Sequence, residues 1–189
     1  LTIDILNYYS QEVRPKVIKY DLALNDLYSK YVKALKENVK TRPFYPDANS
    51  TLRVTYGKVK GFAPRDGMSY NYFTTLDGIF EKEATGNEDF KAPKHLKSLY
   101  EKKDYGQYAD KKDGKIHVAF VASNHTTGGN SGSPVLNATG ELIGTNFDRC
   151  WEGTMSDIMY NSNICRNIVL DVRYTLFVID KYAGAGYLL

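Results

Sequence analysis

The chain has 189 residues, a formal net charge of +3, and 42% hydrophobic and 25% charged residues. This length allows one domain or a domain with an appendage, and the composition is that of an ordinary globular protein. The small net charge gives no reason to expect a nucleic-acid partner. No stretch is long and apolar enough to predict a membrane span.

Residues 1–40 are predicted to form an amphipathic helix. Apolar side chains recur at three- and four-residue steps, which places them on one face: Val17, Tyr20, Leu24, Leu27, Tyr31 and Leu35. Pro15 is expected to begin or kink this helix, and Pro43 and Pro46 to end it. We interpret the stripe as a packing face whose partner surface can lie outside this chain. Because the helical pattern already holds at Leu1, we expect a cut within a longer protein.

The next part of the chain predicts strands and short helices in alternation. Residues 51–62 alternate and are β-branched, which indicates one or two strands, and the sequence at 64–67 indicates a turn. A strand over 72–76 and a short helix over 77–82 are expected to follow. A second helix is predicted over residues 92–105, with leucines facing inward.

The C-terminal part is expected to be richer in strands. A strong strand is predicted over 116–122, and a hairpin turn at 137–140 leads to a return strand over 141–147. Two more short strands are predicted over 157–160 and 167–171. The spacing of the apolar residues over 172–182 favours a terminal helix with Gly184 as its stop.

The segment before the hairpin carries the most informative motif, TTGGNSGSP at 126–134. Glycine lets the backbone bend sharply, which can expose the Ser131 hydroxyl and aim the N–H groups of Gly129 and Ser131 at one point. Two such donors stabilise the oxyanion of acyl transfer. A glycine-rich hairpin without chemistry is the alternative. Because strands are predicted on both sides of the loop, we favour a serine nucleophile of the chymotrypsin-like kind.

A serine nucleophile needs a base, and the base needs an orienting group. The chain has three histidines, His95, His117 and His125. None has the placement expected of a trypsin-like base, which lies well upstream on another barrel. We therefore expect the catalytic histidine and aspartate to be encoded before Leu1.

Asp148 and Arg149 follow the return strand, where chymotrypsin-like enzymes build the wall of their specificity pocket. A guanidinium there offers two parallel donors to a carboxylate, and a neighbouring carboxylate can hold an ammonium group. The alternative is a surface pair beside a packed Trp151. With Ser131 in place, we favour the pocket.

The two cysteines leave their redox state open. A bridge between Cys150 and Cys165 would close a loop of about 15 residues, and two free, partly buried thiols are an equally good interpretation. Neither cysteine has a second Cys or His at ligand spacing, so we expect no metal site and no cofactor.

Several of these motifs together resemble bacterial dipeptidyl-peptidases of the 7/11 type. The resemblance rests on GNSGSPVL at 129–136, LIG at 142–144, NFDR at 146–149, WEG at 151–153 and DVRY at 171–174, with FYPDAN at 44–49 upstream. It implies a serine exopeptidase with a chymotrypsin-like double β-barrel and an inserted helical domain. The fold class would then be mainly β with α segments, comprising part of the C-terminal barrel and a terminal helix.

The same resemblance implies a role for individual residues and parts. Residues 1–42 would be the tail of the helical insertion, and residues 43–189 the C-terminal part of the catalytic domain. Ser131 matches the nucleophile, Gly129 the other oxyanion-hole position, and Asp148 a ligand of the substrate's N-terminal ammonium. Arg149 matches the residue that, in the 11 type, pairs with Asp or Glu at P1, whereas the 7 type has glycine there.

The resemblance also implies a setting. The family consists of periplasmic or surface-associated homodimers that act on peptides with a free N-terminus, and we expect this chain alone to be inactive. Two alternatives stay open: a chymotrypsin-like endopeptidase, and a non-catalytic binding module on the same fold.

Overall fold

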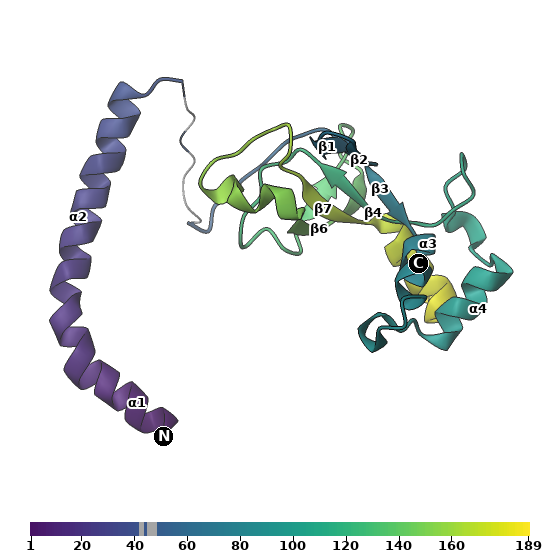
Figure 1. Cartoon of the computed structure of the whole chain (residues 1–189), viewed down its shortest axis with the longest axis horizontal. Helices are drawn as coiled ribbons and strands as arrows, with labels where there is room; N and C mark the ends of the chain where they lie inside the picture. The colour runs from purple at the N-terminus through teal and green to yellow at the C-terminus, as the bar shows by residue number, and fades with distance from the viewer. Residues whose placement is uncertain (42–43, 45–48) are drawn as a thin grey trace. The chain divides into compact units, whose positions relative to one another are not determined.

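The structure is a computed structural model that describes residues 1–41, 44 and 49–189. The chain divides into two compact units, Leu1–Leu52 and Arg53–Leu189, drawn in Figure 1. The boundary predicted between residues 42 and 43 lies outside the described residues, as do Pro43 and Pro46. The predicted division into residues 1–42 and 43–189 therefore stays a prediction.

The first unit is the long helix that the sequence predicts. It consists of α1 (Thr2–Tyr8), a π-helical turn (Tyr9–Val13) and α2 (Arg14–Asn38). Pro15 is the second residue of α2 and lies two residues after this turn. Because proline has no N–H to donate to the carbonyl four residues earlier, the α-helical hydrogen-bond pattern is interrupted just before Pro15, as the sequence predicts.

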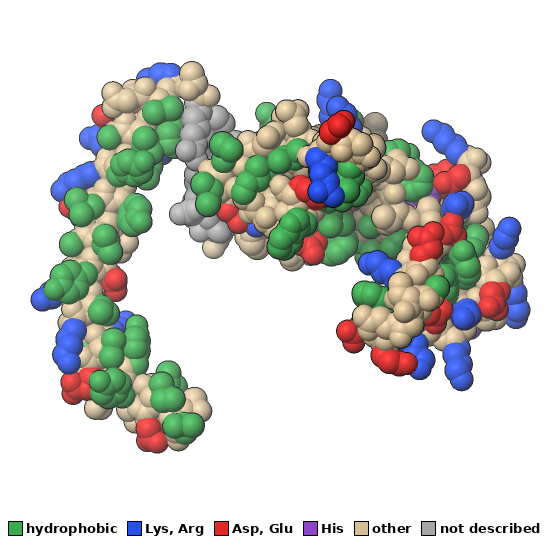
Figure 2. All heavy atoms as spheres, viewed as in Figure 1, with side chains coloured by type: hydrophobic (Ala, Val, Ile, Leu, Met, Phe, Trp, Pro, Cys, Tyr) green, Lys and Arg blue, Asp and Glu red, His purple; other side chains and the backbone are tan. Residues whose placement is uncertain are grey.

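The apolar stripe of α2 is uncovered within this unit. The exposed fractions are 37% for Val17, 50% for Leu24 and 59% for Leu27. Figure 2 shows apolar side chains along the whole helix. None of the described helices is long and apolar enough to cross a bilayer.

The second unit is built on an antiparallel sheet with the strand order β3-β4-β7-β6-β5. A separate antiparallel pair precedes it, β1 (Phe62–Arg65) with β2 (Met68–Tyr70). The strands of the main sheet are β3 (Phe73–Thr75), β4 (His117–Ala122), β5 (Pro134–Leu136), β6 (Leu142–Arg149) and β7 (Asn167–Asp171). These strands confirm the predictions for 72–76, 116–122, 141–147 and 167–171.

The described sheet is open, because its edge strands β3 and β5 do not pair with each other. The fold is mixed α/β, with helices packed at one end of the sheet. The predicted antiparallel strands and flanking helices are confirmed, whereas the described strands do not close into a barrel.

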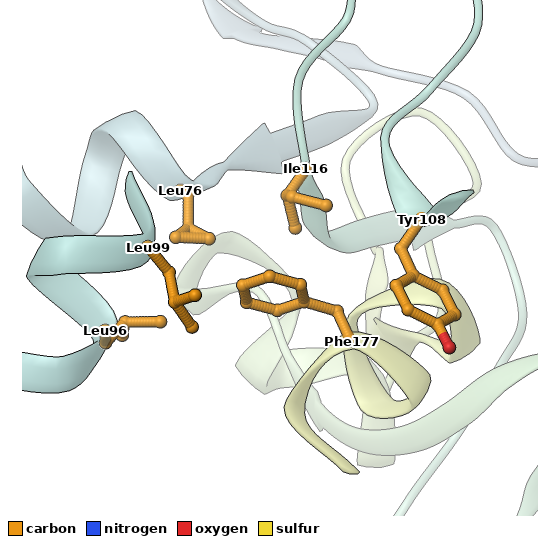
Figure 3. Packing of buried hydrophobic residues seen from close by; sticks show 6 residues of the cluster. All are labelled: Leu76, Leu96, Leu99, Tyr108, Ile116 and Phe177. Atoms are coloured by element: carbon orange, nitrogen blue, oxygen red, sulfur yellow. The ribbon is translucent and has the colours of Figure 1, made fainter. Parts of the chain in front are cut away.

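The main hydrophobic core lies where three helices meet the end of the sheet. These are α3 (Leu76–Glu83), α4 (Lys94–Lys102) and α5 (Val172–Phe177), which continues as a π-helical turn (Val178–Tyr182). Phe177 is fully buried, and Figure 3 shows its ring directed toward Leu96 and Leu99, with Leu76 and Ile116 beside them. The helices predicted at 77–82, 92–105 and 172–182 therefore supply the core.

Short 3₁₀ helices fill much of the remaining chain. They lie at Glu88–Phe90, Gly106–Tyr108, Trp151–Asp157 and Gly186–Leu188. The strand predicted over 157–160 is wrong, because the chain there leaves the Trp151–Asp157 helix and pairs with no strand.

The strand prediction for residues 51–62 is also largely wrong. Only Phe62 enters β1, and Val59 forms an isolated bridge with Ala122. Gly57 lies so close to the neighbouring loop that an added Cβ would come within 2.6 Å of the Asn124 nitrogen. Such close backbone approach, permitted by glycine, interrupts a regular strand.

Arg166 fixes this irregular segment to the rest of the unit. Its side chain is 3% exposed, and its guanidinium donates to the carbonyl oxygens of Lys60 at 3.0 Å and Gly61 at 3.2 Å. It also donates to the carbonyls of Ser162 and Cys165, both at 2.8 Å. A buried cation is thus satisfied by backbone oxygens, which joins segments far apart in sequence.

Replacing Phe177 with Ala is expected to lower the free energy of unfolding by about 3–5 kcal/mol, since it removes a fully buried ring from a packed core. Urea unfolding followed by far-UV circular dichroism measures the change. The matched control is Phe90→Ala, whose side chain is 42% exposed and which should cost less than about 1 kcal/mol. Equal losses in the two variants would contradict this placement of the core.

Candidate active site

The glycine-rich loop between β4 and β5 takes the bent conformation that its sequence predicts. Gly129 and Gly132 have φ angles of 95° and 85°, where side chains with a Cβ are strained. The Asn130 backbone N–H donates to the Thr127 carbonyl at 3.2 Å, and the Asn130 Oδ1 accepts from the Thr127 N–H at 2.9 Å. Ser131 therefore lies between residues whose conformation is fixed on both sides.

Asn146 on β6 holds this loop from the sheet side. Its side chain is 5% exposed, and Nδ2 donates to the Asn130 carbonyl at 3.1 Å. Its backbone carbonyl accepts from the Gly132 N–H at 2.8 Å, and its backbone N–H donates to the Ser133 carbonyl at 2.9 Å. Its Oδ1 accepts from Asn167 Nδ2 at 2.9 Å. One residue therefore contacts both chain neighbours of Ser131.

Ser131 is exposed to solvent. Its Oγ donates to the Phe147 carbonyl at 3.3 Å, a long and weak contact that a base could replace. Within the described part of the chain, the backbone N–H groups of Gly129 and Ser131 donate to no protein acceptor. An exposed hydroxyl and two unused amide donors therefore occur on the same turn.

The three histidines have contacts elsewhere. His95 Nε2 lies 3.4 Å from the Lys181 carbonyl. His117 is buried, stacks on Phe73 with ring centroids 3.9 Å apart, and has Nε2 2.9 Å from Asp113 Oδ2. His125 Nε2 lies 2.9 Å from the Ser156 carbonyl. No hydrogen bond joins any of these rings to the Ser131 hydroxyl.

Arg149 lies at the end of β6, two strand positions beyond Phe147. Its Nη1 donates to Ser156 Oγ at 2.7 Å and to Asp157 Oδ1 at 3.0 Å, and its Nη2 donates to Asp157 Oδ2 at 2.7 Å. The Asp157 carboxylate raises the pKa of Arg149, and in return Arg149 lowers the pKa of Asp157. The guanidinium is thus a charged group held in a bidentate pair.

Asp148 does not pair with the Arg149 side chain. Its Oδ1 accepts from the Arg149 backbone N–H at 2.8 Å, and the residue is exposed. In the described residues its Oδ2 has no protein donor. The alternative interpretation from sequence, a surface pair between Asp148 and Arg149, is therefore wrong. The acidic partner of the Arg149 side chain is Asp157.

Sequence reasoning missed Asn146, Asn167, Ser156 and Asp157. For Asn146 a signal existed, since its alternation with Gly144 along the predicted strand puts a polar amide on the buried face. For Asp157 no such signal existed, because its segment was assigned to a strand. Asn167 is buried at 2% exposure, and its Oδ1 has no hydrogen-bond partner among the described residues.

The cysteines form no disulfide in this structure. Cys150 and Cys165 are both free thiols, with Cys165 buried. Burial raises the pKa of the Cys150 thiol to about 11. The thiol is therefore protonated near neutral pH and is a poor nucleophile.

One cluster outside the loop has the composition of a metal site. Ligand atoms of Asp110, Asp113 and His117 lie within 4.8 Å of one another. Asp110 is already paired with Arg173 at 2.7 Å, and Asp113 contacts His117. Both acidic groups therefore have protein partners, and the Arg173–Asp110 ion pair joins α5 to the turn before β4.

Three comparisons with known proteins find similarity to the same family of peptidases. The family model described as Peptidase S46 matches residues 2–189. An Asp/Glu-specific dipeptidyl-peptidase of Flavobacterium psychrophilum is 54% identical over 96% of this chain, and a dipeptidyl-peptidase 7 of Phocaeicola vulgatus is 45% identical over 98%. The crystal structure of Porphyromonas endodontalis DPP11 in complex with the dipeptide Arg-Glu matches with a TM-score of 0.88 at 48% identity, over 96% of this chain.

The matches cover only part of each relative. The chain spans 25% of the length of both relatives and 26% of the DPP11 chain. Similarity in sequence and in fold therefore extends over nearly all of this chain and over about a quarter of each complete relative.

Replacing Asn146 with Leu is expected to lower the free energy of unfolding by about 2–4 kcal/mol. The variant leaves the Asn130 carbonyl and the Asn167 amide without partners, and each buried unpaired group costs about 1–3 kcal/mol. Urea unfolding measures the loss. The matched control is Asn163→Leu, on an exposed loop position, for which a change within about 0.5 kcal/mol is expected. A stability of the Asn146 variant equal to that of the control would contradict the role of this amide.

Proposed function

Because this chain belongs to the peptidase S46 family, we propose that it supplies the nucleophile and the acid-binding residues of a serine exopeptidase that releases N-terminal dipeptides. The observation that carries the proposal is the exposed Ser131 hydroxyl on a turn with two unused amide donors. Asp or Glu is the preferred residue at P1, in line with the relatives named Asp/Glu-specific.

The chemistry proceeds through an acyl-enzyme. Ser131 Oγ attacks the carbonyl carbon of the second residue while its proton passes to a base, and the carbonyl oxygen becomes an oxyanion. The N–H groups of Gly129 and Ser131 donate to that oxyanion. The base returns the proton to the leaving amine, and water then releases the dipeptide by the same steps in reverse.

We place the base and its orienting carboxylate outside this chain. The three histidine rings contact Lys181, Asp113 and Ser156. The relatives are about four times as long as the matched region, since the chain spans 25% of their length. The remaining three quarters provide room for a histidine and an aspartate.

Two charged groups at the end of β6 account for the substrate preference. Arg149 offers parallel donors to a P1 carboxylate. Asp148 is exposed and keeps Oδ2 for the substrate's N-terminal ammonium, which is the group that distinguishes an exopeptidase substrate.

The wider setting follows from the family resemblance. The open sheet of this chain would be completed into a chymotrypsin-like barrel by strands from the rest of the protein. Residues 1–42 would belong to an inserted helical domain, whose apolar stripe would pack against other helices. We further propose a homodimer in the periplasm or at the cell surface.

In the full-length protein, Ser131→Ala is expected to abolish release of dipeptides from an Asp-containing dipeptidyl reporter, with a loss of several orders of magnitude in kcat. A fluorophosphonate probe should label the parent protein and not this variant. The 189-residue chain by itself should release nothing, because its serine lacks a base. Labelling that persists in Ser131→Ala would contradict the proposal. Absence of labelling in the parent protein would indicate a non-catalytic module, and cleavage of substrates with blocked N-termini an endopeptidase.

Arg149→Gly in the full-length protein is expected to reduce kcat/KM for substrates with Asp or Glu at P1 by about 10- to 100-fold, since a hydrogen bond to a charged group contributes about 1.5–3 kcal/mol. Apolar P1 residues should be accepted better. The control variant is Arg65→Gly, an exposed arginine on β1. An unchanged preference for acidic residues would rule out Arg149 as their ligand.

A further inference from the structure

The Arg149 guanidinium uses only part of its hydrogen-bonding capacity within the protein. The group carries five N–H donors in a fixed plane. Nη1 donates to Ser156 Oγ and to Asp157 Oδ1, and Nη2 donates to Asp157 Oδ2. Three donors are therefore occupied, and all of them belong to the two terminal nitrogens.

The two remaining donors are the Nε–H and the second Nη2 hydrogen. In the part of the chain that the structure describes, neither has a protein acceptor. They point in parallel from one edge of the guanidinium, which is the geometry that accepts a carboxylate in a bidentate way. The side chain of Arg149 is 22% exposed, so that part of it is open to solvent.

The partners on the occupied edge are themselves fixed. Ser156 is 4% exposed, and its carbonyl oxygen lies 2.9 Å from His125 Nε2. The pKa of Asp157 is lowered, first by its hydrogen bond from Arg149, so the carboxylate stays ionised in mildly acidic solution. Through Ser156 and His125, the anchor of Arg149 therefore connects to the segment that leads into the Ser131 loop.

We propose that Asp157, together with Ser156, is a positioning residue of the acid-binding pocket: it holds the Nη1–Nη2 edge of Arg149 so that the adjacent Nε–Nη2 edge faces the substrate's P1 carboxylate. This inference rests on the proposed role of Arg149. In this arrangement the site contains a second carboxylate, that of Asp157. The substrate carboxylate binds beside Asp157 and does not displace it.

Removal of Asp157 has two consequences of opposite sign. The bare guanidinium would attract a substrate carboxylate more strongly, but Asp157 is 48% exposed and solvent screens this gain. Arg149 would also lose its orientation, and a long side chain must be immobilised to form two parallel hydrogen bonds. We expect the loss of orientation to dominate.

The test compares the full-length protein with Asp157→Ala and Asp157→Asn, using reporter substrates that differ only in Asp or Asn at P1. The measured quantity is the ratio of kcat/KM for the acid to that for the amide. Asp157→Ala should lower this ratio about tenfold, and Asp157→Asn less, since an amide oxygen still accepts one of the hydrogen bonds. Asp26→Ala, which removes an exposed helix-surface pair with Lys30, should leave the ratio unchanged.

The outcomes separate this inference from the function that it rests on. A ratio that rises in Asp157→Ala would make Asp157 a competitor of the substrate and overturn the inference. An equal decrease of kcat/KM for both substrates would indicate general structural damage and overturn it as well. If Arg149→Gly abolishes the preference while Asp157→Ala retains it, only the positioning role fails. If Arg149→Gly leaves the preference intact, both proposals fail.

Discussion

Four hydrogen bonds made by Asn146 hold the part of the molecule on which every functional statement depends. They connect a buried amide and its backbone to Asn130, Gly132, Ser133 and Asn167. A loop with two positive φ angles has many alternative conformations in solution, and glycine adds to that freedom. The sheet removes the freedom by offering the loop a fixed set of donors and acceptors. The Ser131 hydroxyl and the neighbouring amides thereby have a defined geometry without any bound ligand, as the proposed oxyanion site requires.

The same strand also delivers the charged end of the site. Asn146 and Arg149 lie on β6, which pairs with β5 on one side and β7 on the other. The hydrogen-bond register of these strands sets the spacing between the loop and the guanidinium. The Ser131 loop and the Arg149 guanidinium, which we propose as nucleophile and acid-binding group, are therefore both positioned by one rigid element, which is more exact than placement by two independent loops.

The core that supports this strand is remote from the site. Phe177 and its neighbours pack between α3, α4, α5 and the end of the sheet, whereas the Ser131 loop and the Trp151–Asp157 helix lie outside this cluster. The site is consequently stabilised by local polar contacts, which are made by Arg166, Asn146 and the Arg149–Asp157 pair. Arg166 and Asn146 are buried, so the loss of one of their partners would leave a costly unpaired group.

The sequence by itself determined the elements and the chemistry that local patterns encode. Helical and alternating periodicities predicted the long N-terminal helix, the strands β3, β4, β6 and β7, and the three helices of the core. The glycine pattern around Ser131 predicted the turn, because φ preference is a property of the residue itself. Strand prediction from local pattern was wrong at 51–62, where close backbone approach interrupts the strand. It was also wrong at 157–160, where the chain leaves a 3₁₀ helix.

Only the tertiary structure decided which groups meet. The partner of Arg149 lies eight residues away, in a segment with no strand, so local pattern pointed to the adjacent Asp148 instead. The amide contact from Asn146 to Asn167 likewise joins two strands through their register. The tertiary structure also decided that the sheet formed by the described strands is open and that both cysteines are free thiols. The physical reason is that such contacts depend on pairing between distant segments, and neither periodicity nor propensity carries that information.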